Sequence, residues 1–236
     1  MLGDASRAAQ LVALLPDVDE LGRYLTVLRQ AGFVVVNGPE AACGHPLTRE
    51  IVLGSIPRGV RRELHVRARR DFGVDDLRIP LEAHALHAYH AGESFEALML
   101  LEQTAARSRA RDDPEGAVRA LRRALELARV EMARGELDDP ESAMMMFSTK
   151  LGDALVLAGK HQDAEGILTE ALGMAGPQAK ERPRILASLA NAAHGIGHPA
   201  DAYTYLDDAL RLAEKTKQTQ LMDKLELMRQ RWFAGS

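Results

Sequence analysis

The chain repeats itself in two stretches, LGDALVLAGKHQDAEGILTEALGMAGP at 151–177 and LANAAHGIGHPADAYTYLDDALRLAE at 189–214, which align without a gap at an offset of 38 residues. Glycine, alanine and leucine recur at four matching positions, which are Gly159, Ala164, Leu168 and Ala171 opposite Gly197, Ala202, Leu206 and Ala209. Antiparallel helices need small residues where their backbones cross and glycine in the tight turn between them. The repeat therefore predicts stacked pairs of antiparallel helices.

Two earlier segments carry weaker copies of this pattern, DDPEGAVRALRRALEL at 112–127 and GESFEALMLLEQTA at 92–105. The tripeptides Asp113-Pro114-Glu115 and Asp139-Pro140-Glu141 each supply a helix N-cap, a proline in the first turn and an early carboxylate. Together these signals predict helices near 81–91, 93–111, 114–133, 140–158, 161–174, 181–195, 199–215 and 218–233, the last of which would cap the stack.

Composition supports a helical protein and narrows the partner classes. Of the 236 residues, 46% are hydrophobic but only 4% are aromatic, a balance that suits helices packed through leucine and alanine. The net charge of -4 disfavours nonspecific binding to nucleic acid or anionic membranes. The single cysteine excludes an internal disulfide and, with no secretory signal in the sequence, predicts a cytoplasmic location. No apolar run approaches the roughly 20 residues that span a bilayer.

The repeat resembles the tetratricopeptide (TPR) family, whose motif of about 34 residues has a Leu-Gly pair, glycine, small alanines and a closing proline at fixed positions. The match is best at 151–177, on Leu151, Gly152, Leu155, Gly159, His161, Ala164, Leu168, Ala171 and Pro177. The chain departs from the family where it places leucine or histidine at aromatic positions and lacks the early tryptophan. The resemblance implies a solenoid whose first helices line a concave groove.

Residues 1 to 80 lack the repeat. They contain two expected helices (ASRAAQLVALL and DVDELGRYLTVLRQAG), the β-branched run FVVV, the turn NGPEAACG and further helices through RRELHVRARR. Helices followed by a small hairpin suggest a winged helix. The string from GFVVV to RRELH resembles the segment that joins a winged helix to repeats in bacterial regulatory ATPases of the STAND class, including forms fused to serine/threonine kinases.

The predicted fold is therefore mainly α. A winged-helix-like subdomain with a short β-hairpin occupies 1–75, and a TPR-like antiparallel helix-pair solenoid occupies 76–236. If the second resemblance holds, the chain is the C-terminal sensor part of such a regulator, and the ATPase and kinase parts lie outside it.

Motifs that suggest catalysis do not complete a site. Asp71-Phe72-Gly73 spells the magnesium-binding motif of kinases, but no catalytic loop or glycine-rich loop precedes it. The glycines from Gly152 to Gly159-Lys160 have the wrong spacing for a phosphate loop. Cys43 lies in the predicted turn without a linked histidine and aspartate pattern. We predict no catalytic residue in this chain.

Histidines cluster at His84, His87 and His90, and two neighbours could share a metal ion. A stable zinc site needs three or four ligands, and no nearby cysteine or carboxylate completes the set, so partly exposed packing histidines are favoured and no metal or cofactor is predicted. His194 and His198 have suitable spacing, but a turn separates them.

The stretch 144–146 (Met-Met-Met) is assigned to core packing rather than to an adaptable recognition surface.

A basic run includes Arg58, Arg61, Arg62 and Arg67, which a winged helix could place on DNA phosphates. Glu63 interrupts the run and few base-reading residues accompany it, so a solvated or interdomain face is favoured over a nucleic-acid surface.

The TPR resemblance implies which side chains line the groove. Its groove positions correspond to Glu102, Arg109, Thr149, Asp153, Arg184, Asn191 and His194. Charged members would orient a ligand, and Asn191 could hold its backbone. The family's clamp for chaperone tails fits only at Asn191 and Arg184, so chaperone binding is not predicted.

The sequence thus favours a protein-interaction or sensor module in bacterial signalling, with a protein or peptide as partner and an attached or associated ATPase or kinase as a further candidate. Binding to membranes is not expected. The alternative is a DNA-binding regulator that uses its N-terminal region.

Overall fold

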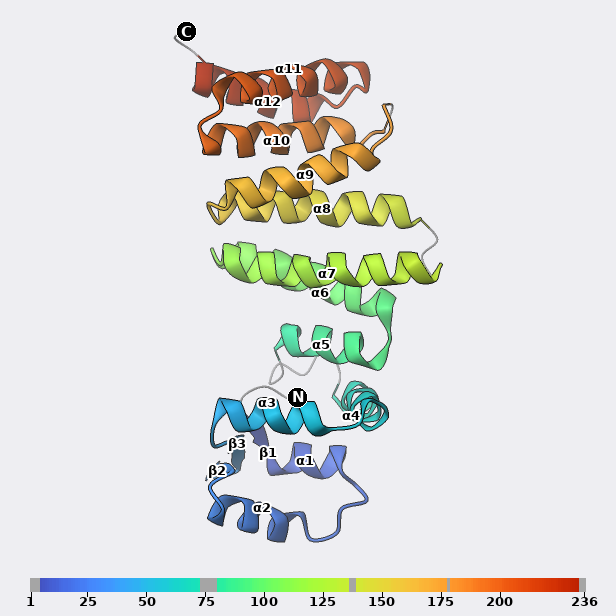
Figure 1. Ribbon diagram of the computed structural model, residues 1–236, viewed down its shortest axis with the longest axis vertical. Helices are drawn as coiled ribbons and strands as arrows, with labels where there is room; N and C mark the ends of the chain where they lie inside the picture. Colours follow the sequence, from blue (N-terminus) through green and yellow to red (C-terminus); the bar gives the residue numbers. More distant parts are fainter. Residues whose placement is uncertain (1–4, 73–79, 136–138, 178, 234–236) are drawn as a thin grey trace. The chain divides into compact units, whose positions relative to one another are not determined.

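The computed structural model describes residues 5–72, 80–135, 139–177 and 179–233. The chain divides into two compact units, Met1–Leu100 and Leu101–Ser236, and helices dominate both (Figure 1). The domain boundary predicted at residue 75 lies outside the described residues.

The first unit combines a small sheet with short helices. Its elements are β1 (Ala5–Arg7), α1 (Ala8–Leu14), α2 (Leu21–Gln30), β2 (Val34–Asn37), β3 (Glu40–Cys43), α3 (Pro46–Ser55), α4 (Arg58–Asp71) and α5 (Leu81–Ala91). The β-branched run forms β2 as expected, and β3 pairs antiparallel with both β2 and β1 in the order β1-β3-β2.

One prediction about the start of the chain was wrong. A helix was predicted from Ala5, but Ala5–Arg7 is a strand, with Ala5 opposite Ala42 and Arg7 opposite Glu40. The backbone groups of these residues bond to the free edge of β3 instead of to a helical turn, and the helix begins only at Ala8.

The second unit is a stack of antiparallel helices. Helix α6 (Ser94–Ala110) leads into it, followed by α7 (Pro114–Arg134), α8 (Pro140–Leu157), α9 (His161–Met174), α10 (Arg182–Ile196), α11 (Pro199–Lys215) and α12 (Thr219–Phe233). From α7 to α12 each helix packs on the next, and α8 also packs on α10 (Figure 1). The predicted helix-pair solenoid is confirmed, with helix ends within a few residues of the expected ones.

Small residues allow the helices of this unit to approach closely. A Cβ atom on Gly152 of α8 would overlap the Leu168 side chain of α9, and one on Gly195 of α10 would overlap His161. Gly159 and Gly197 hold positive φ angles of 73° and 93° in the turns between paired helices. The glycines of the repeat therefore have structural roles in packing and turns.

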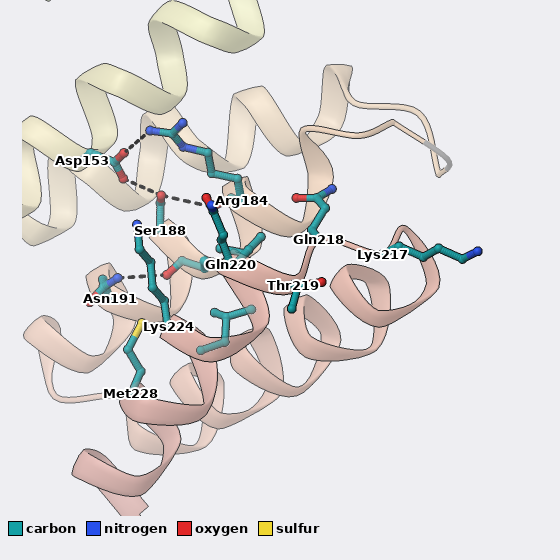
Figure 2. Close-up of a pocket in the computed structure, with 13 residues that line it drawn as sticks. Asp153, Arg184, Ser188, Asn191, Lys217, Gln218, Thr219, Gln220, Lys224 and Met228 are labelled. Atoms are coloured by element: carbon teal, nitrogen blue, oxygen red, sulfur yellow. Dashed lines mark hydrogen bonds and ion pairs between the residues drawn. The ribbon is translucent and has the colours of Figure 1, made fainter.

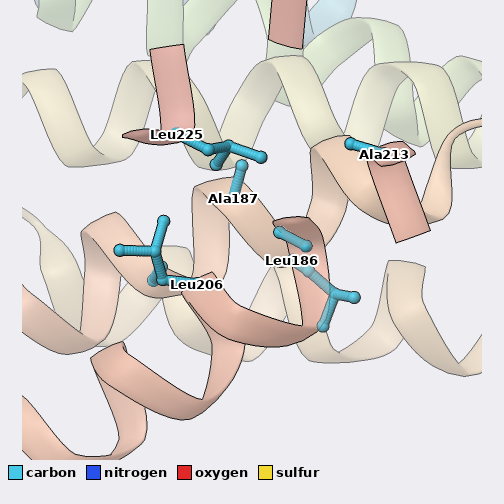
Figure 3. Close-up of a cluster of buried hydrophobic side chains, with 7 residues drawn as sticks. Leu186, Ala187, Leu206, Ala213 and Leu225 are labelled. Atoms are coloured by element: carbon cyan, nitrogen blue, oxygen red, sulfur yellow. The ribbon is translucent and has the colours of Figure 1, made fainter. Parts of the chain in front are cut away.

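Buried leucine and alanine side chains fill the space between the helices. One cluster joins α10, α11 and α12 through Leu186, Ala187, Ala190, Leu206, Ala209, Ala213 and Leu225 (Figure 3). Met144 and Met145 are buried in α8, as core packing predicted, whereas Met146 is partly exposed. Asp113 and Asp139 accept hydrogen bonds from backbone N–H groups of their helices, which confirms both N-caps.

Across the described ranges, no helix has both the length and the apolar character needed to cross a bilayer.

Candidate ligand-binding groove

A groove with a volume of about 770 Å³ opens between α8, α10 and α12 in the second unit (Figure 2). Asp153 contributes from α8, and Arg184, Ser188 and Asn191 contribute from α10. Helix α12 forms the third side of the groove and contributes Lys224 and Met228. The groove therefore combines charged, amide and hydroxyl groups with apolar ones, a mixture that ligand-binding sites use.

Asp153 ties α8 to α10. Its Oδ1 accepts a hydrogen bond from Ser188 Oγ, and its Oδ2 pairs with Arg184 Nη2 at 3.4 Å. The Arg184 side chain is 57% exposed, so this ion pair faces solvent and contributes little to stability. Arg184 can therefore exchange Asp153 for a carboxylate of a ligand with only a small loss of free energy.

Asn191 and Lys224 face each other across the groove. Asn191 Nδ2 donates to the backbone oxygen of Ala187 at 3.1 Å, and because an amide nitrogen carries two N–H groups, one donor remains for a ligand. The Lys224 side chain extends from α12 toward Ser188 and Asn191, whereas Lys217 points away from them at the open end (Figure 2). Neither lysine forms an ion pair with any residue that the structure describes.

The floor of the groove is apolar and rigid. Ala187 and Leu225 are buried members of the α10–α12 core cluster, and Leu221 and Met228 are partly buried against the same cluster. Because the floor is part of the packed core, it holds its shape without a ligand.

Of the seven predicted groove residues, the structure brings together Asp153, Arg184 and Asn191. Glu102 of α6 is instead paired with Lys150 of α8, and Arg109 is exposed on α6 without lining this groove.

Thr149 and His194 also have other surroundings. Thr149 is buried, and its hydroxyl donates to the backbone oxygen of Met145 at 2.7 Å. It is therefore not available to a ligand. His194 stacks on Trp232, with ring centroids 4.2 Å apart and an interplanar angle of 14°.

Ser188 of α10 was also missed, and Lys224 and Met228 were missed because α12 was expected to be only a cap. Helix α12 begins about one repeat length after α10, and this spacing was the available signal that α12 would occupy the next groove-lining place.

Two solved structures are similar to this chain. They are a Podosopora anserina kinesin light chain with nearly identical TPR-like repeats and a variant of the same protein, each 16% identical, with TM-scores of 0.30 and 0.31. They match 83% and 84% of this chain and 96% of their own length. No protein-family model matches the sequence, and no curated protein matches it. The helix-pair architecture follows from the packing of the chain itself.

A second groove of about 480 Å³ lies between α7 and α9. Its arginines are already neutralised, because Arg122 pairs with Asp163 at 3.0 Å and Arg129 pairs with Glu170 at 2.8 Å. These ion pairs link the two helices and leave the groove without a free cation among its described lining residues.

The basic run of the first unit makes mostly internal contacts. Arg61 donates to the backbone oxygen of Leu53, and Arg62 donates to that of Ala91 at 3.0 Å. Arg67 pairs with Glu63 at 2.7 Å and with Asp17 at 3.3 Å. Arg58 is exposed in the first turn of α4. These contacts favour a structural role over a phosphate-binding face.

Histidines pack between α4 and α5. His65 Nδ1 lies 3.0 Å from His87 Nδ1, and His84 and His87 are fully buried where partial exposure was expected. Burial, with smaller contributions from neighbouring histidines, lowers the pKa of His65 to about 3 and that of His87 to about 4. Within the described part of the chain, no group of three or more potential ligands is arranged to hold a metal ion.

The motifs considered for catalysis have structural surroundings. Asp71 ends α4 and Phe72 is buried beside Leu14 and Ala68, while Gly73 lies outside the described residues. Cys43 is exposed and ends β3 rather than lying in a turn.

Proposed function

We propose that this chain is a protein-interaction module that holds a peptide segment of a partner protein in the groove between α8, α10 and α12. The observation that carries this proposal is the pairing of an apolar surface, made by Leu221 and Met228 over the buried core, with the free polar groups of Asn191 and Lys224. An apolar floor gives contact area, and polar groups at the rim fix the direction of the bound backbone. The proposal assigns binding, not catalysis, to this chain.

We further propose that the module serves a bacterial cytoplasmic signalling protein, linked to a STAND-type ATPase or a serine/threonine kinase. The element order β1-α1-α2-β2-β3 and the antiparallel sheet β1-β3-β2 support a winged-helix-like subdomain over 1–75 ahead of the repeats at 76–236. In such a regulator, occupation of the groove would control the attached enzyme.

A pull-down with matched charge swaps tests the groove. The groove variant is Asp153→Lys/Arg184→Glu, and the control is Arg122→Glu/Asp163→Lys in the α7–α9 groove. Both swaps conserve net charge and keep opposite charges at paired positions, so each pair can form again. Circular dichroism of both variants verifies that they are folded.

We expect a partner that binds the native chain and the control but not the groove variant. A partner retained equally by both variants would refute the groove as the binding site and direct attention to residues 1–80. Failure of the native chain to capture any partner from its source cells would refute the interaction role.

A further inference from the structure

The groove between α8, α10 and α12 carries an excess of positive charge. Its charged lining residues are Arg184, Lys217 and Lys224 against the single acid Asp153. Because Asp153 is already paired with Arg184, both lysines are left without a countercharge among the described residues. This local excess contrasts with the net charge of -4 on the whole chain. The groove is therefore a positive site in an acidic protein.

The α7–α9 groove of the same unit has the opposite balance. Its acids Glu126, Asp163 and Glu170 outnumber Arg122 and Arg129, and both arginines are paired. Positive charge is thus a property of one groove and not of the whole helical stack. A negatively charged ligand is therefore expected to bind the groove between α8, α10 and α12 in preference to the α7–α9 groove.

The positive charge lies where a carboxylate could be bound. Lys224 extends toward Asn191, and together they offer an ammonium group and a free amide N–H (Figure 2). The N-terminal end of α12 opens onto the same groove through Gln218, Thr219 and Gln220, and its backbone N–H groups add a partial positive charge.

Apolar side chains lie directly beside these donors. Leu221 and Met228 line the groove one turn before and one turn after Lys224 on α12. A ligand held by Lys224 would place its neighbouring residue against this apolar surface. A peptide with an acidic residue next to an apolar one satisfies both requirements.

We propose that the partner segment is an acidic peptide whose Asp or Glu side chain is bound by Lys224 and Asn191, with an adjacent apolar residue against Leu221 and Met228. This inference rests on the proposed function of the groove. A nucleic-acid strand is the less suitable polyanion, because the groove has no aromatic side chain among its described lining residues on which a base could stack.

Selection from a display library of random peptides of about 12 residues, with the folded full chain as target, tests the inference. We expect enriched peptides to carry Asp or Glu beside Leu, Ile, Val, Met or Phe. Affinity measured by fluorescence anisotropy should fall about tenfold for Lys224→Gln and recover with Lys224→Arg, since a hydrogen bond to a charged group is lost and restored.

Lys215→Gln is the matched control, because Lys215 is an exposed lysine of α11 that does not line the groove. It should leave the affinity unchanged. Raising the salt concentration should weaken binding to the native chain more than binding to Lys224→Gln, because one ionic contact has been removed.

The outcomes separate the two proposals. Enriched peptides that are neutral or basic, or acidic peptides that bind Lys224→Gln as tightly as the native chain, would overturn the acidic-ligand inference while peptide binding itself stands. No enrichment of any peptide would contradict the proposed function. A labelled single-stranded oligonucleotide that binds the native chain, competes with the peptides and loses affinity with Lys224→Gln would replace the peptide with a nucleic acid.

Discussion

Acidification should loosen the α4–α5 helix pair, because His65 and His87 are buried there in neutral form. Their pKa values lie near 3 and 4 in the folded chain, against 6.5 for an unperturbed histidine. The unfolded chain therefore binds more protons than the folded chain between about pH 6.5 and about pH 4. The neutral histidines make their full contribution to the free energy of unfolding above about pH 6.5, and this contribution is lost as the pH falls from about 6.5 to about 4.

The size of the effect follows from the two pKa differences. At about pH 5 each histidine is almost fully protonated in the unfolded chain and neutral in the folded one, which is worth about 2 kcal/mol per group. The two rings are in contact, so the pair should lose between about 2 and about 4 kcal/mol. The neighbouring His84, His90, Arg61 and Arg69 lower the pKa values of these two rings further, because positive charge nearby disfavours protonation.

Hydrogen exchange measured by mass spectrometry at about pH 7.5 and about pH 5 is the appropriate assay, with opening free energies corrected for intrinsic exchange rates. Peptides from α4 and α5 should lose protection at the lower pH. His87→Leu should reduce the pH dependence, and the exposed His198→Gln should not change it. Equal opening free energies of α4 and α5 at the two pH values would refute the reasoning.

Two further predictions concern the second unit, and both can be measured by urea unfolding monitored through Trp232. Gly152→Ala should destabilise the unit by about 1 to 3 kcal/mol, because its Cβ would overlap Leu168, whereas Gly166→Ala, in open space on α9, should stabilise it by up to about 1 kcal/mol. Equal effects of the two alanines would contradict the close approach of α8 and α9. Lys217→Gly should stabilise the turn before α12 by about 1 kcal/mol, because Lys217 has a φ of 57°; a loss of stability would contradict this conformation.

Most of the helical architecture was predictable because its causes are local. Proline and aspartate at helix starts, and glycine in the turns, mark positions where the chain has few alternatives. The strand β1 was not predictable in this way. Ala5 becomes part of a strand only because it pairs with Ala42, far along the chain, and an isolated Ala-Ser-Arg segment carries no such information.

The groove was predictable only in part. Asp153, Arg184 and Asn191 come together because they lie on successive first helices of the repeat. Thr149 lies one turn before Asp153, but its side chain turns back to its own helix and is buried. Lys224 could not be placed while α12 was considered only a cap, because a cap has no ligand-facing side.

Photo-crosslinking with the partner segment tests most directly whether the α8, α10 and α12 groove is the binding site. A benzophenone amino acid at Gln220 would lie in this groove, and one at Ile167 would lie in the α7–α9 groove. The account predicts crosslinks to the segment from position 220 and none from position 167. Crosslinks from 167 alone, or from neither position while the segment remains bound, would contradict it.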